Sequence, residues 1–163
     1  MIIVLMGVSG AGKTTIGRLL AGELGWTFYD ADDVHVPANV EKMRRGEPLN
    51  DDDRVPWLEK LRDLLRAMLE SGSSAVVACS ALKTLYREYL LIDEQVRLVY
   101  LKGDYSLIQD RLNQRQDHYM NPSLLESQFA TLEEPEQAIT VDVAASPADI
   151  IRSIREELSI VAE

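Results

Sequence analysis

The sequence predicts an α/β protein whose core is a five-stranded parallel sheet flanked by helices. Five short runs rich in apolar and β-branched residues alternate with longer helical stretches. Most of these runs are continuously apolar, as expected for strands that helices cover on both faces. The strands are expected at residues 2–6, 27–30, 74–79, 97–101 and 139–143.

Six helices are expected between these strands. Gly25 and Gly72 are suitable helix stops, and Ser146 followed by Pro147 is a suitable helix start. The ranges are 14–24, 56–70, 82–92, 105–115, 122–131 and 147–158.

Two irregular stretches interrupt this alternation. Residues 34–53 hold two prolines, a glycine and many charges, and we interpret them as a substrate-covering insertion. Residues 114–122 are polar and basic, and we place a mobile lid there that takes in about 111–131. The whole chain, 1–163, is expected to be a single domain with these two insertions.

The composition is that of a soluble globular protein. Of the 163 residues, 46% are hydrophobic and 27% are charged, and no apolar run approaches the length of a membrane span. The N-terminal run lacks the basic leader and cleavage site of a signal peptide, so we interpret it as a strand. The single cysteine, Cys79, lies in an apolar stretch, which favours a buried thiol and a cytoplasmic location.

The net charge of −10 restricts the partners that the chain can have. It argues against binding nucleic acid, which requires a basic face. It also repels small anions at long range, so a site for an anionic ligand must gather its own lysines and arginines.

The strongest motif is G-x-x-x-x-G-K-[ST], matched by GVSGAGKT at residues 7–14. It lies between a predicted strand and a predicted helix, as a phosphate-binding loop requires. We expect Lys13 to reach the β- and γ-phosphates of ATP and Thr14 to offer its hydroxyl to Mg²⁺. The expected nucleotide-binding residues of the loop are Gly7, Val8, Ser9, Gly10, Ala11, Gly12, Lys13, Thr14 and Thr15.

The loop alone does not select a reaction, and a glycine-rich turn with a coincidental Lys-Thr is the simpler alternative. ATPases, GTPases, kinases and motor proteins share the motif. We find no N-K-x-D guanine signature and no D-x-x-G switch motif in the expected places. A small chain without partner-binding modules favours a metabolite kinase.

Carboxylates follow the second strand, at the sheet edge where the loop would present the γ-phosphate. Alternation along an extended segment would place Asp30 and Asp32 on one side and Asp33 on the other. Asp32 is the candidate base and hydroxyl positioner, and Asp30 a candidate second-shell partner of Mg²⁺ or Lys13. The alternative is a solvated acidic turn.

Cationic side chains that could form the required positive pocket lie near predicted loops and helix ends. Arginine can clamp a carboxylate or phosphate with two parallel hydrogen bonds. Any one of these residues, taken alone, could be a solvated surface charge. They are Lys42, Arg54, Lys83, Arg87, Arg111 and Arg115.

Many short motifs together resemble the bacterial gluconate kinase family, over residues 2 to about 143. The most specific are PLNDDDR-x-PWL and CSALK-x-x-YR. The matching stretches are GVSGAGKT at 7–14, DAD at 30–32 with His35, NVEKM at 39–43, GEPLNDDDR at 46–54, PWL at 56–58, CSALK at 79–83, Tyr86-Arg87, LKG at 101–103, Arg111-Leu112, Arg115, His118, SQF at 127–129 and Leu132-Glu133.

The resemblance implies a nucleoside-monophosphate-kinase-like fold with a lid, a homodimer, and transfer of the ATP γ-phosphate to gluconate. It implies that Arg54, Lys83 and Arg87 hold gluconate together with His35. It further implies that Arg111 faces adenine and that Arg115 contacts the transferring phosphoryl group. With Lys13 and Asp32, Arg115 completes the expected catalytic set.

The chain departs from the family pattern at three places. Ala31 stands where glycine is usual between the two aspartates, and Asp117 stands where glycine usually precedes His118 in the lid. The connector after residues 133–135 is shorter than usual. The adenine side is expected at residues 144–147.

Two other functions remain open from sequence. One is a kinase for another small hydroxy acid such as shikimate, which shares the loop and the aspartate after the second strand. The other is a nucleotide-dependent regulatory protein without phosphotransfer. The PLNDDDR and CSALK motifs favour gluconate over the first, and the complete set of Lys13, Thr14, Asp32 and Arg115 argues against the second.

Overall fold

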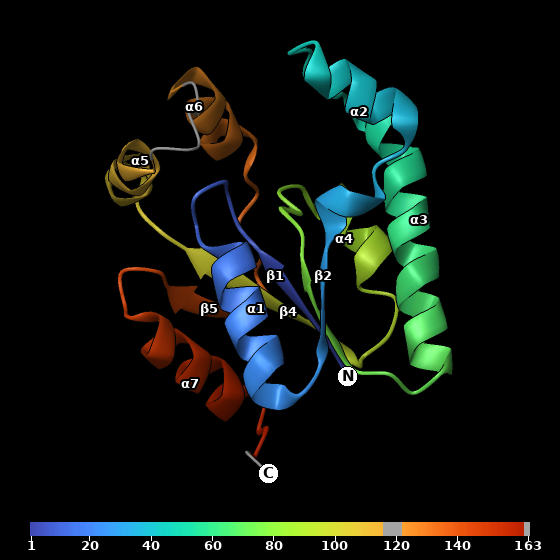
Figure 1. Cartoon of the computed structure of the whole chain (residues 1–163), viewed down its shortest axis with the longest axis vertical. Coiled ribbons are helices and arrows are strands. Elements are labelled where there is room, and N and C mark those ends of the chain that lie inside the picture. Colours follow the sequence, from blue (N-terminus) through green and yellow to red (C-terminus); the bar gives the residue numbers. More distant parts are fainter. Residues whose placement is uncertain (116–121, 162–163) are drawn as a thin grey trace.

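The computed structural model, which describes residues 1–115 and 122–161, contains a five-stranded parallel sheet. The strand order is β2-β3-β1-β4-β5, and every neighbouring pair is parallel (Figure 1). The strands are β1 (Ile2–Met6), β2 (Thr27–Asp30), β3 (Ala75–Ala78), β4 (Val96–Lys102) and β5 (Ile139–Asp142). This confirms the predicted fold class.

Helices cover both faces of the sheet, which explains why the strands are continuously apolar. On β1, Ile3 and Leu5 face a cluster that includes α1 (Lys13–Leu24) and α7 (Pro147–Glu157). The alternate residues of β1 face α3 (Asp51–Glu70) and α4 (Thr84–Leu90) on the other side. All five residues of β1 are fully buried, so this strand forms the centre of the core.

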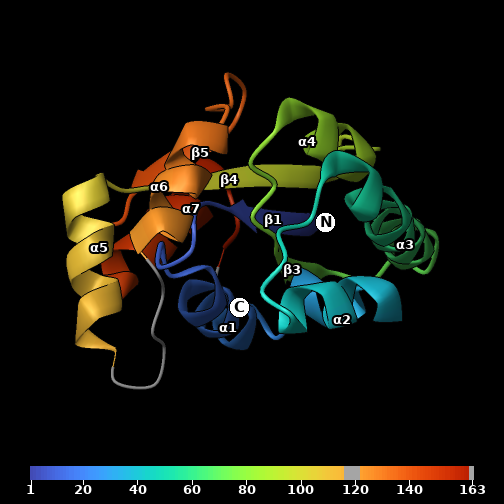
Figure 2. The same ribbon diagram turned by 90° about the horizontal axis from the view of Figure 1, so that it is seen from above.

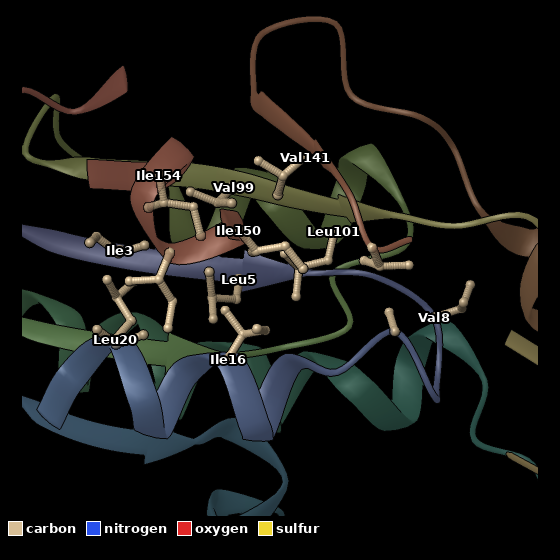
Figure 3. Packing of buried hydrophobic residues seen from close by; sticks show 14 of the residues in the cluster. Ile3, Leu5, Val8, Ile16, Leu20, Val99, Leu101, Val141, Ile150 and Ile154 are labelled. Atoms are coloured by element: carbon tan, nitrogen blue, oxygen red, sulfur yellow. The ribbon is translucent and has the colours of Figure 1, made fainter. Parts of the chain in front are cut away.

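The first of these clusters joins the phosphate-loop helix to the C-terminal helix. Figure 3 shows Ile3 and Leu5 of β1 beside Ile16 and Leu20 of α1, with Ile150 of α7 in the same cluster. This packing holds the N-terminal end of α1 in a fixed relation to the carboxyl end of β1.

Three helices lie beyond the carboxyl end of the central strand. Figure 1 shows α2 (Pro37–Arg44) on one side, and α5 (Tyr105–Gln114) with α6 (Pro122–Thr131) on the other. The same separation is visible in the view from above (Figure 2). No helix in the described ranges is long and apolar enough to cross a membrane.

The region between β2 and α3 is more regular than the sequence indicated. Residues 31–34 form the short 3-10 helix η1 (Ala31–Val34), and Pro37 begins α2. Helix α3 starts at Asp51 instead of residue 56, because Asn50 and Asp53 form a reciprocal capping box. Asp30 is extended as expected, but the expected extended backbone at residues 31–33 is wrong, so Asp30 and Asp32 do not approach by strand alternation.

Candidate active site

The loop between β1 and α1 requires glycine at two central positions. Gly10 has φ +85°, and a Cβ there would lie 2.9 Å from Leu112 Cγ of α5. Gly12 is the N-cap of α1 with φ +96°. Side chains are disfavoured in this left-handed region, and α5 leaves no room for one at Gly10. The loop therefore exposes backbone N–H groups at the positive end of α1, which suits phosphate.

Lys13 folds back over the loop that precedes it. Its Nζ donates to Gly7 O at 2.8 Å and to Val8 O at 3.0 Å. Burial lowers the pKa of Lys13, whereas the nearby Asp32 and Asp30 charges raise it. An anion at the loop would therefore receive a partly desolvated ammonium group, whose attraction is stronger than in water.

Asp30 connects α1 to η1 through both of its carboxylate oxygens. Oδ2 accepts a hydrogen bond from Thr14 Oγ1 at 3.3 Å, and Oδ1 accepts from the Asp32 N–H at 3.0 Å, which caps η1. These oxygen donors fit Mg²⁺, which prefers such ligands and retains waters and substrate phosphates among them. Among the described residues no group of three His, Cys, Asp or Glu could hold a metal by itself.

Asp32 projects into the space beside the loop. Its side chain is 79% exposed, and desolvation by the surrounding protein raises the pKa of this carboxyl. The Asp30 charge raises the Asp32 pKa further, and Lys13 lowers it. A carboxylate with a raised pKa is a better proton acceptor than an ordinary aspartate.

A cavity of about 640 Å³ joins the predicted catalytic residues. It brings together Lys13, Asp32 and Arg115, although they come from the start of α1, from η1 and from the end of α5. The other residues that line it are Ser9, Gly10, Gly12, Thr14, Thr15, Asp30, Ala78, Cys79, Ser80, Leu112 and Leu124. Burial raises the pKa of the Cys79 thiol to about 12, which argues against a nucleophilic cysteine.

Arg54 and Lys83 form a second cluster, centred on Tyr86 and Asp51. Arg54 Nη1 donates to Leu49 O at 2.7 Å and to the Tyr86 hydroxyl at 3.2 Å. Lys83 Nζ donates to both Asp51 oxygens, at 3.0 and 3.1 Å, and the Tyr86 hydroxyl donates to Asp51 Oδ1 at 2.5 Å. These hydrogen bonds, that of Tyr86 foremost, lower the pKa of Asp51.

The sequence motifs contained Asp51 and Tyr86 but gave neither a role. The one signal in the sequence was position: Asp51 lies in the DDDR motif with Arg54, and Tyr86 directly precedes Arg87, and both arginines were predicted to contact substrate. A charge network between residues 32 to 35 positions apart cannot be read from spacing alone.

His35 is held between η1 and α3. Its ring stacks on Trp57, with 4.3 Å between centroids, and its Nε2 lies 3.9 Å from Asp32 Oδ1. Burial and the Arg54 charge lower the pKa of His35, so the imidazole is neutral near pH 7. Its buried Nδ1 makes no hydrogen bond within the part of the chain that the structure describes.

Arg87 differs from the other predicted substrate contacts because internal acceptors surround its guanidinium. It is 5% exposed. Nη1 donates to Ala81 O and Leu82 O at 2.8 and 3.2 Å, and Nη2 donates to Thr84 Oγ1 and Glu133 O at 3.1 and 2.9 Å. This geometry favours a structural brace over a direct contact with substrate.

Arg111 is not among the residues that line the cavity, although its neighbour Leu112 is. Its Nη2 donates to Val143 O at 2.6 Å, directly before residues 144–147, where the adenine side is expected. The centre of the predicted lid, with Asp117 and His118, lies outside the described residues, and the lid stays a prediction.

Comparison with known proteins agrees with this geometry. The chain matches the profile of the family described as Shikimate kinase over residues 9–158. It is 44% identical over 179 residues to a probable gluconokinase of Rattus norvegicus, covering 96% of this chain and 97% of that protein. It is 50% identical over 134 residues to a gluconokinase of Gluconobacter oxydans (strain 621H), covering 82% and 75%.

Solved structures give the same result. A gluconokinase from Sinorhizobium meliloti 1021 superposes with a TM-score of 0.85 at 40% identity, covering 98% of this chain and 92% of that one. Shikimate kinase from Aquifex aeolicus vf5 shares the fold, with a TM-score of 0.58 at 20% identity over 98% and 96% of the two chains. A P-loop, a parallel sheet of this order and these identities lead to one conclusion: the chain belongs to the gluconokinase family of P-loop kinases.

Proposed function

We propose that this protein is an ATP-dependent gluconokinase, which converts D-gluconate and ATP to 6-phosphogluconate and ADP. The observation that carries the proposal is the cavity in which Lys13, Asp32 and Arg115 meet. The curated relatives at 44% and 50% identity, named probable gluconokinase and gluconokinase, support gluconate as the acceptor.

Phosphoryl transfer asks the protein mainly for positioning and charge stabilisation. Lys13 and the loop amides would hold the β- and γ-phosphates, and Arg115 would approach the transferring group from α5. Mg²⁺, held by Thr14 with Asp30 behind it, would neutralise charge on the phosphates when bound.

Asp32 would orient the acceptor hydroxyl and accept its proton. The hydroxyl oxygen forms the new bond to the γ-phosphorus, and the bond from that phosphorus to the bridging oxygen of ADP breaks. The proton passes to Asp32, whose raised pKa suits it for this role.

The cluster of Arg54, Lys83 and His35 would bind the carboxylate and hydroxyls of gluconate. Arg54 and Lys83 both lie over the Tyr86 ring, and because Asp51 pairs with Lys83, the cluster carries one net positive charge. The neutral His35, whose Nε2 lies 3.9 Å from Asp32 Oδ1, would hydrogen-bond a sugar hydroxyl. We assign Arg87 to holding this segment in place.

The proposal includes a homodimer and a cytoplasmic location. The dimer rests on the resemblance to gluconate kinases, and the location on the single buried cysteine. Light scattering after size-exclusion chromatography would test the dimer.

The deciding experiment is a coupled ADP-release assay with MgATP and gluconate, beside shikimate, glucose and no acceptor. ADP release that depends on gluconate, and is lost in Asp32→Asn, supports the proposal. Activity with shikimate alone would favour the second candidate, which the matching Shikimate kinase profile keeps open. ATP binding without turnover on any acceptor would instead favour the nucleotide-dependent regulatory protein.

A further inference from the structure

A glutamine on α6 holds one residue of the phosphate loop at two points. Gln128 Oε1 accepts the Ser9 N–H at 2.7 Å, and Gln128 Nε2 donates to Ser9 Oγ at 3.0 Å. The two residues are 119 positions apart. Figure 2 shows α6 passing beside the loop that follows β1. The contact is therefore a tertiary link between α6 and the nucleotide side of the cavity.

The chemistry of the groups fixes the direction of both hydrogen bonds. A backbone N–H can only donate, so the carboxamide oxygen of Gln128 must face it, and the carboxamide nitrogen then faces Ser9 Oγ. Because Nε2 can only donate, the Ser9 hydroxyl acts as an acceptor toward Gln128. Within the described ranges no acceptor takes its own hydrogen, which can donate in another direction.

The direction that remains for this hydrogen includes the cavity. Ser9 lines the cavity with Lys13, Thr14 and Arg115, the residues expected around the nucleotide phosphates. Phosphate oxygens are acceptors, and a hydroxyl aimed at them gains a charge-assisted hydrogen bond.

Helix α6 is also fixed from its far end. Glu133, just beyond α6, donates its N–H to Leu82 O at 2.8 Å, and its Oε1 accepts the Thr84 N–H at 2.7 Å. Arg87 Nη2 donates to Glu133 O at 2.9 Å. The position of Gln128 is therefore set by the segment that carries Lys83, on the acceptor side of the site.

From this geometry we infer that Gln128 is a positioning residue for the nucleotide. It holds the Ser9 hydroxyl as an acceptor toward α6, so that the hydroxyl donates to a phosphate oxygen of ATP. The inference rests on the proposed ATP-dependent function and extends it by assigning a role to α6. The competing possibility is that Gln128 occupies the Ser9 N–H, so that this hydrogen bond must break before the loop can bind phosphate.

Nucleotide binding without an acceptor separates these possibilities. Calorimetry would measure the Kd of a nonhydrolysable ATP analogue with Mg²⁺ for the wild type, Ser9→Ala, Gln128→Ala and the double variant. Each single substitution should weaken binding about tenfold or more, the effect of losing one hydrogen bond to a charged group. The double variant should bind about as weakly as either single variant, because both remove the same interaction.

Two further variants at Gln128, with a control at Ser127, distinguish positioning from simple bracing. Gln128→Met keeps the size of the side chain but makes neither hydrogen bond, so it controls for any disturbance of α6 by the smaller alanine. It should bind the analogue as weakly as Gln128→Ala does. Gln128→Glu can still accept the Ser9 N–H but cannot donate to Oγ, so the hydroxyl turns toward the carboxylate. It should bind the analogue at least as weakly as Gln128→Ala. Ser127→Glu places the same charge one position away on the exposed surface of α6 and should bind nearly normally.

Tighter binding by Gln128→Ala would show that Gln128 competes with the nucleotide and would overturn the inference. Unchanged binding, additive losses in the double variant, or normal binding by Gln128→Glu would overturn it too. So would a wild type that does not bind the analogue at all. If the wild type binds the analogue but does not phosphorylate gluconate, the proposed function fails and the role of Gln128 stands or falls on the binding data alone.

Discussion

At the scale of single residues, Asp32 shows how function opposes stability. Its pKa is raised by desolvation and by Asp30, so the folded state holds the proton more tightly than the unfolded state does. The ionised form of Asp32 therefore lowers the free energy of unfolding at every pH above its folded pKa. This cost disappears as the pH falls below the ordinary aspartate value of about 3.9.

Asp32→Asn should therefore lose most turnover and gain a little stability. The gain at pH 7 should be at most about 1 kcal/mol, because solvent in the cavity screens an exposed carboxylate. Thermal unfolding of both proteins from pH 7 to pH 3.5 would show a difference that shrinks toward acid. A lower Tm for the variant at pH 7 would contradict the raised pKa.

The wild-type activity should carry the same signature. If the ionised Asp32 accepts the proton, kcat/KM falls in acid through a pKa above that of an ordinary aspartate. The residual activity of Asp32→Asn should lack this acid limb. Full activity in that variant would remove Asp32 from the mechanism.

At the scale of elements, Trp57 connects α3 to the turn that carries Asp32. Its Nε1 donates to Ala31 O at 2.7 Å in a buried setting, and its ring supports His35. Trp57→Phe keeps the aromatic packing but leaves the Ala31 carbonyl without this donor, at a cost of about 1–3 kcal/mol. Because η1 then loses its anchor, kcat should fall about tenfold or more.

The chain offers a matched control in its second tryptophan. Trp26 lies directly before β2, and it is partly buried in the cluster on the other face of the sheet from Trp57. Trp26→Phe should lower Tm without a comparable loss of kcat. Equal kcat losses in both variants would indicate a general effect of aromatic truncation and not the positioning of Asp32.

Two arginines of the acceptor segment should behave differently when each is replaced by methionine. Arg87→Met leaves the carbonyls of Ala81 and Glu133 without this donor, while Leu82 O keeps the Glu133 N–H, and the loss should cost about 2–4 kcal/mol of stability. Arg54→Met removes a charge from the proposed gluconate site and should raise the KM for gluconate about 10- to 100-fold. Melting curves and KM values for gluconate, measured for both proteins, would test the contrast. A large increase in KM with normal stability in Arg87→Met would show that Arg87 contacts the substrate.

Elements were predictable from sequence where one periodic signal dominated. The bounds of β1, β2 and α6 agree with the expected ranges, because apolar runs and prolines or glycines mark their ends. The helix α2 was missed because charged residues such as Lys42 and Arg44 hide any apolar face. The early start of α3 depended on reciprocal capping by Asn50 and Asp53, a pair that departs from the usual Ser/Thr with Glu/Gln.

At the scale of the whole molecule, the candidate site depends on the strand order. The central β1 carries the phosphate loop, and its neighbour β3 leads to Lys83 while β2 leads to Asp32. The sequence motifs contain Lys13, Asp32 and Arg115, which the structure places around one cavity. They could not show that Arg87 is enclosed by carbonyls or that Gln128 contacts Ser9, because such contacts form only after distant segments pack.

The net charge also acts on the whole molecule. At pH 7 the chain carries −10, and its sequence pI is about 4.7. Most of the described ion pairs, such as Arg44 with Glu41, are on the surface and contribute little. Repulsion among the excess carboxylates should therefore be the main salt-dependent contribution to stability.

We expect Tm to rise at pH 7 as NaCl increases from about 10 to 150 mM, because the screening length falls from about 30 to 8 Å. The rise should shrink near pH 4.7, where the net charge vanishes. Sulfate should add a second stabilisation, because the loop amides and Lys13 offer an anion site. In Lys13→Met the NaCl effect should persist and most of the additional sulfate effect should be lost. Equal responses of both proteins to sulfate would mean that the anion acts on the surface as a whole and that the phosphate loop contributes no separate site.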